Sequence, residues 1–397
     1  MATDVRVLHV IDHLTGGGAE SSLRSFLAAS ADCGLEQGVV VLDGAPDSRA
    51  IASELVHHSW AGPPSSGIRP GDRRLVRQAM AGFEPHVVHS SLYRSMLAAS
   101  MARPRRPHIH TLTSTEYAGD APGLRGRQRL GLQASHWLYG RLLGRRHVTI
   151  HAVSESVRQA AMERFGISSD RFVVIPRGRP DPAAASLGDP VATRRALGVA
   201  AAEVVAIAVA REHPIKNHIA LLEAVAALRL RGVDARLLLV GPCGDASTHI
   251  YQAIGALSLG EATLRLGQRD DVPDLLGAAD IFVSTSFSEG MPGSIIEALA
   301  SRVPVAAFRA PGVTDALGED HVGLVPFGDH QALADRIDCL SRPGEARDTA
   351  IAVGRRRYLS EFSMDKHVAR MSDLYRSLAV AHHVSDGRRR HQGDVQP

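Results

Sequence analysis

The sequence predicts an α/β protein made of two doubly wound domains, each a parallel sheet covered by helices on both faces. Short β-branched runs alternate with helical patterns along almost the whole chain, which is typical of such sheets. The 397 residues, 44% of them hydrophobic, are enough for two cores of ordinary size. One segment, 176–190, is rich in Pro, Gly, Ala and Asp and lacks apolar periodicity, so we expect the domains to be joined there.

The expected elements follow from hydrophobic runs and periodicity. The first domain, 1–180, has strands expected at 5–11, 37–43, 86–89, 108–112, 148–153 and 172–175, with helices near 19–32, 72–82, 92–102, 127–144 and 154–165. After a linker at 181–197, the second domain, 198–360, has strands expected at 203–210, 235–241, 263–267, 281–286 and 304–308, with helices near 217–231, 248–258, 293–301 and 330–340. Both patterns are typical of Rossmann-like domains, which would face each other across a cleft.

The C-terminal region is expected to be helical and then unstructured. A helix at 361–382 is expected to pack back on the first domain. Residues 383–397 are polar and are expected to be disordered, with no chemistry of their own.

Composition limits the partners and the location. The formal net charge of +3 is too small to argue for a nucleic-acid partner. The three cysteines, Cys33, Cys243 and Cys339, lie far apart and have no metal-ligand spacing, so we expect a reducing, cytoplasmic location. The first residues resemble no signal peptide and no apolar stretch reaches the ~18–20 residues of a membrane span, so any membrane contact is expected to be peripheral.

Ligands of open α/β sheets bind beyond the carboxyl ends of the strands, and three stretches stand there. The first is LTGGGAES at 14–21, after the first strand. Its glycines, Gly17 and Gly18 among them, and the start of the following helix suit a phosphate. The alternative is a flexible strand-to-helix turn, because the full GxGxxG spacing is absent.

The second stretch is VAREHPIKNH at 209–218, which places Arg211 and Lys216 in one loop before a helix. Paired cations facing the cleft would neutralise a diphosphate. Two surface charges on a solvated loop are the alternative. Only two of the 45 basic residues are lysines, Lys216 and Lys366, which favours a specific role for Lys216.

The third stretch is SEGMPGSIIEALA at 288–300. Pro292 suits the first position of a helix, whose amino end would bind an anion. Glu289 and Glu297 would flank that anion and accept hydrogen bonds from hydroxyls, as the two ends of a nucleoside diphosphate sugar require. The alternative is that Glu289 only complements the helix dipole and Glu297 is solvated. The residues expected around the ligand are Gly290, Met291, Pro292, Gly293, Ser294 and Ile295.

Over residues 5–380 the chain resembles the GT-B glycosyltransferases of family 4, which act with retention. The most specific match is a glutamate pair with seven residues between its members, Glu289 and Glu297. GGAE at 17–20, the Arg211 and Lys216 pair, and AVSESVR at 152–158 support it. The resemblance implies transfer of a sugar from a nucleotide sugar to a hydroxyl acceptor.

The resemblance also implies roles for individual residues. Glu289 would hold sugar hydroxyls and Glu297 the ribose, while Arg211 and Lys216 would bind the diphosphate and stabilise the leaving group. The loop with Gly17 and Gly18 would close on the phosphate. The resemblance further implies contacts by His110 near the reacting carbon, by Arg269 at the nucleobase, and by Glu20 and His89 at the acceptor.

Four histidines near expected strand ends compete for the role given to His110: His86, His89, His108 and His110 itself. By alternation His108 and His110 share a face, so only the resemblance selects between them. A histidine in such a place is about as often a structural hydrogen-bonding residue.

No metal cofactor is expected. The sequence contains no DxD motif, and Asp270 and Asp271 precede a short helix, where capping explains them. Cations of the protein would then carry the leaving group's charge.

Three positions depart from the family pattern. Arg177 stands where the family has Asn after Pro, Arg302 stands where it has a turn glycine, and Asp315 stands where it has Glu. A left-handed glycine position would resist Arg302. These departures keep open a second hypothesis, an inactive nucleotide-sugar-binding partner of another transferase. An NAD-dependent oxidoreductase is disfavoured by the poor glycine fingerprint.

Segment 125–147 combines six arginines with leucines, Trp137 and Tyr139 at roughly helical spacing. A basic amphipathic helix of this kind can lie on anionic lipid, which would suit a lipid-linked acceptor. The favoured alternative is a helix packed on the first sheet with its arginines in water.

Overall fold

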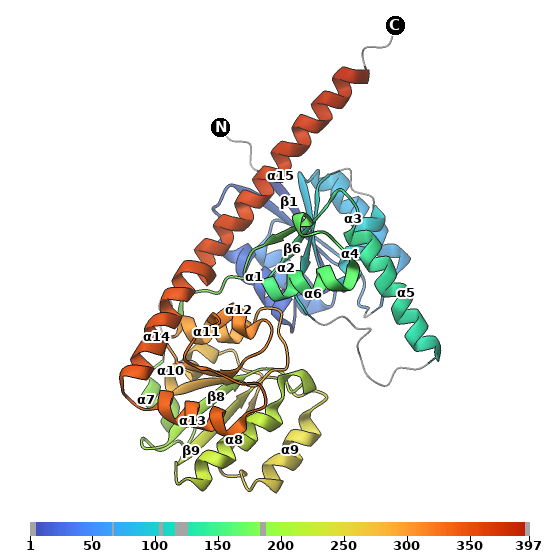
Figure 1. Cartoon of the computed structure of the whole chain (residues 1–397). Helices are drawn as coiled ribbons and strands as arrows, with labels where there is room; N and C mark the ends of the chain where they lie inside the picture. Colours follow the sequence, from blue (N-terminus) through green and yellow to red (C-terminus); the bar gives the residue numbers. More distant parts are fainter. Residues whose placement is uncertain (1–4, 66, 103–105, 116–125, 183–187, 394–397) are drawn as a thin grey trace. The chain divides into compact units, whose positions relative to one another are not determined.

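The structure of the protein is a computed structural model. It describes residues 5–65, 67–102, 106–115, 126–182 and 188–393. The chain forms two compact units, each built around its own parallel sheet (Figure 1). The first unit comprises residues 1–178 together with 364–397, and the second comprises 179–363. The chain is therefore α/β with two doubly wound sheets, as the alternation of elements predicts.

The first unit has a seven-stranded sheet in the order β3-β2-β1-β4-β5-β6-β7, whose described pairs are all parallel. Its elements are β1 (Val5–Ile11), α1 (Gly18–Ala29), β2 (Leu35–Val41), α2 (Pro46–Leu55), β3 (His58–Ala61), α3 (Pro70–Phe83), β4 (Val87–Ser91), α4 (Tyr93–Ala102), β5 (His108–Leu112), α5 (Gly126–Leu143), β6 (Val148–Ala152), α6 (Glu155–Phe165), the 3-10 turn η2 (Ser169–Arg171), β7 (Phe172–Val174) and α15 (Met364–Gly393).

Two cores lie on the two faces of this sheet because successive strand side chains point to opposite sides. On one face, Val7 and Val39 pack with residues of α1, α2 and α15, among them Phe26 and Met371. On the other face, Leu8 packs with residues of α3 and α4. Helix α15 comes from the far end of the chain and supplies part of the first unit's core.

The second unit has a six-stranded sheet in the order β10-β9-β8-β11-β12-β13, again with parallel pairs. Its elements are α7 (Pro190–Ala196), β8 (Val204–Val209), the 3-10 turn η4 (Pro214–Lys216), α8 (His218–Leu230), β9 (Ala235–Val240), α9 (Ser247–Ala256), β10 (Thr263–Gly267), α10 (Val272–Ala278), β11 (Ile281–Ser284), α11 (Gly293–Ala300), β12 (Val305–Phe308), α12 (Val313–Leu317), β13 (Leu324–Val325), α13 (His330–Ser341), α14 (Glu345–Arg357) and the π-helical turn η5 (Tyr358–Phe362). Residues of α8, α9 and α13 fill one face.

Several elements differ from the expected ones. Part of the expected linker is helix α7, which is tied to α10 because Arg194 Nε donates to the Ala278 carbonyl at 2.8 Å. Strands β3 and β13 were not expected; they are edge strands of four and two residues. Residues 383–393, expected to be disordered, continue α15, and no proline interrupts that helix before Gly393.

A row of buried polar side chains runs from strand to strand across the first sheet. His9 and His89 are register partners on β1 and β4. His9 Nε2 lies 3.1 Å from Gln37 Oε1, and His89 Nε2 lies 2.6 Å from Thr111 Oγ1. Thr111 Oγ1 lies 2.9 Å from Nδ1 of His151, the last histidine of the row. Each ring thus has a polar partner within the core, as buried polar groups require.

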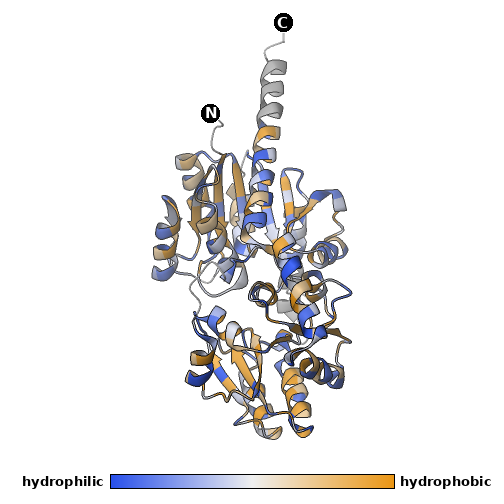
Figure 2. Ribbon diagram, turned by 90° about the vertical axis from the view of Figure 1, so that its left-hand side faces the viewer, coloured by the Kyte–Doolittle hydropathy of each residue, from blue (hydrophilic) through white to orange (hydrophobic). Residues whose placement is uncertain are grey.

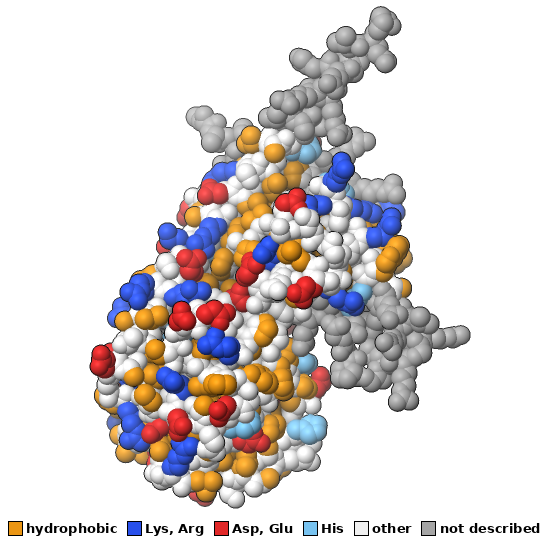
Figure 3. All heavy atoms as spheres, viewed as in Figure 1, with side chains coloured by type: hydrophobic (Ala, Val, Ile, Leu, Met, Phe, Trp, Pro, Cys, Tyr) orange, Lys and Arg blue, Asp and Glu red, His pale blue; other side chains and the backbone are white. Residues whose placement is uncertain are grey.

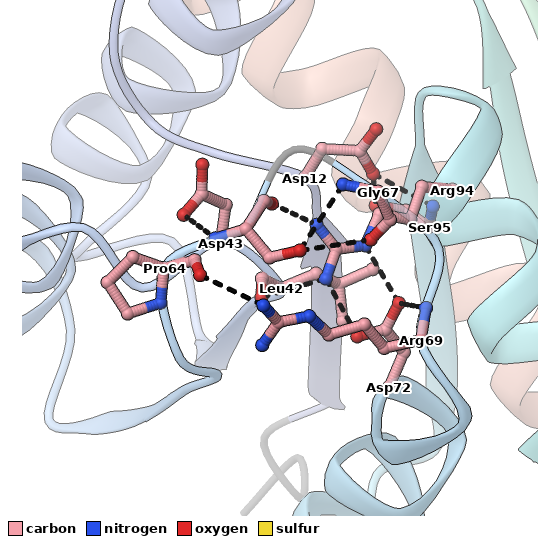
Figure 4. Close-up of polar contacts among 10 residues, drawn as sticks. Asp12, Leu42, Asp43, Pro64, Gly67, Arg69, Asp72, Arg94 and Ser95 are labelled. Carbon is pink, nitrogen blue, oxygen red and sulfur yellow. Dashed lines mark hydrogen bonds and ion pairs between the residues drawn. The ribbon is translucent and has the colours of Figure 1, made fainter.

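A second polar network lies where β1 and β2 end (Figure 4). Buried Arg94 makes two hydrogen bonds to Asp72, at 2.7 and 2.8 Å, and donates to the Ser65 and Leu42 carbonyls. Asp12 accepts a hydrogen bond from the Ser95 backbone N–H at 2.8 Å in the first turn of α4. The network fixes the loop around Ser65 and gives the buried guanidinium the partners that it needs.

Arg302 does occupy a left-handed position, with φ of 58°. It follows α11, and its backbone N–H donates to the Leu299 carbonyl at 3.3 Å. A non-glycine residue costs roughly 1 kcal/mol in this conformation. The fold therefore accepts strain at the turn where the family pattern has glycine.

Hydropathy and charge are distributed as in ordinary globular units. Hydrophobic residues concentrate in the strands of both sheets (Figure 2). On the face shown in Figure 3, basic and acidic side chains are interspersed. This mixture agrees with the small net charge of +3 and gives that face no field of a single sign.

Candidate functional site

In the second unit, the loops that carry Lys216 and Glu289 lie at the switch point of the sheet. Strands β8 and β11 are neighbours there, although they are far apart in sequence. The loop after β8 leads to α8, and the loop after β11 leads to α11. Ligands of open α/β sheets bind at such a switch point, beyond the carboxyl ends of the strands.

Lys216 and Glu289 meet directly at this place. Lys216 Nζ lies 2.5 Å from Glu289 Oε1, and the Ser286 hydroxyl donates to the same oxygen at 2.7 Å. The side chains of Lys216 and Glu289 are 24% and 14% exposed. The pair is therefore a charge-assisted hydrogen bond that is largely shielded from water but still partly exposed.

The two loops that carry this pair are bonded to each other. The Phe287 backbone N–H donates to the Ile215 carbonyl at 2.9 Å, and the Thr285 hydroxyl donates to the Asn217 carbonyl at 2.9 Å. Glu289 donates its N–H to the Pro311 carbonyl at 2.9 Å. Gly312, at φ of 76°, lies so close that a Cβ there would be 2.2 Å from the Glu289 carbonyl oxygen. The backbone thus determines where Glu289 stands.

A small recess of about 20 Å³ opens over the pair. Lys216, Glu289, Ser286 and Ser294 line it, together with buried His218. Burial lowers the pKa of His218 to about 4, so this ring is neutral at pH 7. Arg211, predicted beside Lys216, is exposed and is absent from the lining residues that the structure describes.

The amino end of α11 has no side-chain cap. The helix begins at Gly293, as predicted, and Pro292 is its N-cap residue rather than its first residue. The first N–H groups of such a helix have no partner within the helix and suit an anion. Met291 and Ile295 are buried in the core and anchor this end, whereas Ser294 faces the recess. Gly290 and Pro292 are also buried.

Glu297, the second glutamate of the pattern, is bound by an arginine that the sequence did not indicate. Arg179 Nε donates to Glu297 Oε1 at 2.7 Å. The Glu297 side chain is 34% exposed, so it still reaches solvent, while the Arg179 side chain is 5% exposed.

Two acidic residues of the second unit have local partners. Asp271, expected to cap α10, is at the N-cap position but makes no capping hydrogen bond. Its carboxylate instead binds Arg269, with Arg269 Nε 2.7 Å from Oδ1, because that guanidinium is two residues away. Asp315 accepts a hydrogen bond from the Gly312 N–H at 3.1 Å and so holds the turn beside Glu289.

In the first unit, the glycine loop precedes α1, with Gly17 as N-cap and Gly18 as first residue. Glu20, predicted as an acceptor contact, is buried, and its Oε1 lies 3.3 Å from His13 Nδ1. A Cβ at Gly17 would clash with the Glu20 carboxylate, which would then have to move. Gly16 takes the left-handed conformation of the turn, at φ of 97°.

The structure places His110 in the core rather than at a sheet edge. Its Nδ1 lies 2.8 Å from Ser90 Oγ and its Nε2 lies 2.6 Å from Tyr139 OH. His108 shares this face and the same serine, at 2.8 Å. Both ring nitrogens of His110 are used within the unit, which favours the structural alternative for this residue.

His89 lies on the opposite face and lines a pocket of the first unit. The pocket, about 50 Å³, is bounded by α1, α15 and the strands. Arg177, one of the departures from the family pattern, lines it together with Thr113. Arg177 is buried, and its Nη1 would lie 3.1 Å from a Cβ at Gly18.

Comparison with known proteins supports the resemblance in both units. A family model described as Glycosyltransferase Family 4 matches residues 16–180, and a model described as Glycosyl transferases group 1 matches residues 203–342. The chain belongs to the family 4 glycosyltransferases. The matched ranges include both the glycine loop and the recess with Lys216 and Glu289.

Individual relatives of this glycosyltransferase are distant. It is 27% identical over 293 residues to a D-inositol 3-phosphate glycosyltransferase of Salinispora arenicola, a match covering 69% of this chain and 63% of the relative. It is 26% identical over 183 residues to an N-acetyl-alpha-D-glucosaminyl L-malate synthase of Bacillus anthracis, covering 46% and 48%. Less than two thirds of either relative is matched.

The fold is shared with solved GT-B structures. One is HepE from Anabaena in complex with UDP and glucose, with a TM-score of 0.77, 20% identity, and coverage of 94% of this chain and 100% of that chain. At this identity the likeness concerns the fold alone. It confirms the two-sheet α/β architecture that the sequence predicts.

None of the helices that the structure describes combines the length and apolar character of a membrane span. Within the same residues, no three His, Cys, Asp or Glu side chains are grouped so that they could hold a metal ion.

Proposed function

We propose that this family 4 glycosyltransferase moves a sugar from a nucleoside diphosphate sugar to a hydroxyl acceptor. The observation that carries the proposal is the Lys216–Glu289 pair, which shares a recess with Ser294 of the uncapped helix α11. A cation and the positive end of a helix suit a diphosphate, and a carboxylate beside them suits sugar hydroxyls.

The donor would use these groups in different ways. Lys216 and the first N–H groups of α11 stabilise the departing diphosphate, and exposed Arg211 on the same loop adds a second cation. Glu289 accepts hydrogen bonds from the sugar, and Glu297 accepts them from the ribose. Arg269 lies at the nucleobase. With cations of the protein in this role, the reaction needs no metal cofactor.

The proposed stereochemistry is retention. The departing diphosphate takes the proton of the acceptor hydroxyl on the face that it leaves, so no protein base is required. The anomeric coupling constant of the product, measured by proton NMR, decides between retention and inversion.

The acceptor is proposed to bind the first unit. The pocket offers the Thr113 hydroxyl and the Arg177 cation. His89 also lines it, but its two ring nitrogens already lie within hydrogen-bond distance of Tyr375 and Thr111. A relative is named for D-inositol 3-phosphate, which carries hydroxyls and an anionic group. We propose that the hydroxyl of an acceptor of this kind, or of a glycan or a lipid-linked acceptor, binds at that pocket.

A thermal-shift panel of UDP-, GDP- and ADP-sugars tests the donor site. One donor class is expected to raise the melting temperature of the wild type by about 5 °C at saturation, since a ligand that binds only the native state stabilises it. The shift should persist with EDTA and should shrink in Glu289→Ala. No shift with any donor would contradict the proposal. A shift without turnover on any hydroxyl acceptor would favour an inactive binding partner instead.

We further propose that α5 contacts the cytoplasmic face of an anionic membrane. Trp137 and Leu138 are 64% and 41% exposed, and the Arg141 guanidinium lies 5.1 Å from the Trp137 ring centroid. Aromatic and basic side chains on one exposed stretch favour a lipid headgroup region. The side chains of 126–133, and residue 125, lie outside the described residues.

Co-sedimentation with vesicles tests this contact. Trp137→Ala is expected to reduce binding to phosphatidylglycerol vesicles several-fold, with no binding to phosphatidylcholine alone. The matched control is Tyr251→Ala, because Tyr251 is 71% exposed on α9 of the other unit and should not affect binding. Equal binding of the Trp137 variant and the wild type would contradict the membrane contact.

A further inference from the structure

Arg179 is a buried cation that the family pattern does not account for. It is the first residue of the second unit and is 4% exposed. Its backbone N–H donates to the Phe362 carbonyl at 2.9 Å, and its carbonyl accepts from the Tyr358 hydroxyl at 3.1 Å. These bonds to η5 fix the backbone, so the side chain is aimed by the fold.

The guanidinium of Arg179 lies against the first residue of α11. A Cβ built at Gly293 would be 2.2 Å from Arg179 Nη2 and 2.9 Å from Cζ. Glu297, which accepts from Arg179 Nε at 2.7 Å, follows Gly293 by four residues and therefore shares its helix face. The cation thus lies along α11 from its amino end to Glu297.

This placement is electrostatically unusual. The amino end of a helix carries partial positive charge, so a cation there is disfavoured unless an anion is present. Glu297 offsets the charge of Arg179 but does not offset the partial positive charge of the helix end. The opposite end of α11 shows the favourable arrangement, because Arg355 Nη1 donates to the Ala300 carbonyl at 2.9 Å. The guanidinium of Arg179 and the partial positive charge of the helix therefore meet at the amino end of α11, where the proposed donor binds.

We propose that Arg179 is a donor-binding and positioning residue for the diphosphate and the ribose of the nucleotide sugar. Its guanidinium adds a cation at the amino end of α11, and its bond to one oxygen of Glu297 turns the other oxygen toward a ribose hydroxyl. This inference rests on the proposed donor site and adds a residue to it. A side chain at position 293 would displace the guanidinium.

Isothermal titration with UDP, GDP and ADP tests the role of Arg179. For the nucleotide that binds the wild type, Arg179→Gln is expected to raise the Kd about 10- to 100-fold, as loss of a charged hydrogen bond does. The salt dependence of the Kd should weaken, and Arg179→Lys should recover part of the affinity. Gly293→Ala should also raise the Kd, because the added methyl group displaces the guanidinium, although the buried charge itself is retained.

The matched control is Arg355→Gln. Arg355 also binds a residue near the start of the second unit, with Nη2 2.5 Å from Asp181 Oδ2. It lies, however, at the carboxyl end of α11. The variant is expected to lower the melting temperature and to leave the nucleotide Kd unchanged. A purely structural role for Arg179 would give the same result for Arg179→Gln and Arg355→Gln.

The outcomes separate this inference from the proposed function. If the wild type binds a nucleotide and both Arg179→Gln and Gly293→Ala bind it with the same Kd, the role of Arg179 is refuted and the donor site stands. If the wild type binds none of the three nucleotides, the donor site itself is refuted. Should Arg179→Gln not fold, Gly293→Ala and Arg179→Lys decide alone.

Discussion

Replacing Lys216 with alanine is expected to lower the turnover number by about 10²–10³-fold, the usual loss when one group that stabilises developing charge is removed. Lys216 is the cation that lines the recess and lies 2.5 Å from Glu289. Its loss removes charge from the leaving-group site and also leaves the carboxylate, 14% exposed, without its ion-pair partner.

The kinetic pattern distinguishes catalysis from simple binding. Charge on the diphosphate grows as the bond to the sugar breaks, so an interaction with Lys216 strengthens in the transition state. We therefore expect kcat to fall more than the KM for the donor rises. A rise in KM at constant kcat would assign Lys216 to ground-state binding only.

The chain supplies its own control for this experiment. Lys366 is the other lysine of the sequence and is exposed on α15 of the first unit. Lys366→Ala should retain full activity, and Lys216→Arg should retain part of it because charge is kept but geometry changes. Full activity of Lys216→Ala would refute the proposed mechanism.

Much of the fold follows from local patterns because fully buried parallel strands read as continuous hydrophobic runs. β1, whose sequence VRVLHVI is mostly hydrophobic, begins and ends where the sequence predicts. β3 does not show this pattern, since its residues His58–Ala61 form an edge strand whose first two residues are exposed. An edge strand of two residues such as β13 carries no periodicity at all.

Some residues of the site could likewise be predicted from the local sequence, whereas others depend on contacts between residues far apart in the chain. Lys216 and Glu289 could be predicted because both follow strands that parallel topology brings together. The bond between Arg179 and Glu297 joins residues 118 positions apart, and no local pattern reports it. The environment of His110 was also inaccessible, because alternation shows that a side chain faces one side of a sheet but not that Tyr139 covers it.

Acidification from pH 7.5 to 5 is expected to destabilise both units by several kcal/mol. Burial lowers the pKa of His9 and His151 to about 4 and of His108 to about 3 in the first unit. It lowers the pKa of His218 and His321 to about 4 in the second. Urea unfolding followed by circular dichroism at a series of pH values measures the effect.

The choice of variants isolates the histidines from the carboxylates. Between pH 7 and 5 most carboxylates, with ordinary pKa values near 4, stay ionised in both states, so histidines dominate the slope. His151→Gln can keep a donor for the Ile175 carbonyl, which His151 Nε2 meets at 2.8 Å, while removing the titration. It should flatten the dependence, whereas a variant of exposed His249 should not.

The sign follows from proton uptake. An unfolded histidine binds a proton below about pH 6.5, whereas these folded rings stay neutral until about pH 4 or lower. Between these values the unfolded chain holds more protons, so the free energy of unfolding falls as the pH falls. Each unit of pKa difference costs up to about 1.4 kcal/mol. With three such rings in one sheet, the loss approaches the ~5–15 kcal/mol by which domains are stable. A free energy of unfolding that stays constant down to pH 5 would show that these rings are hydrated and titrate normally.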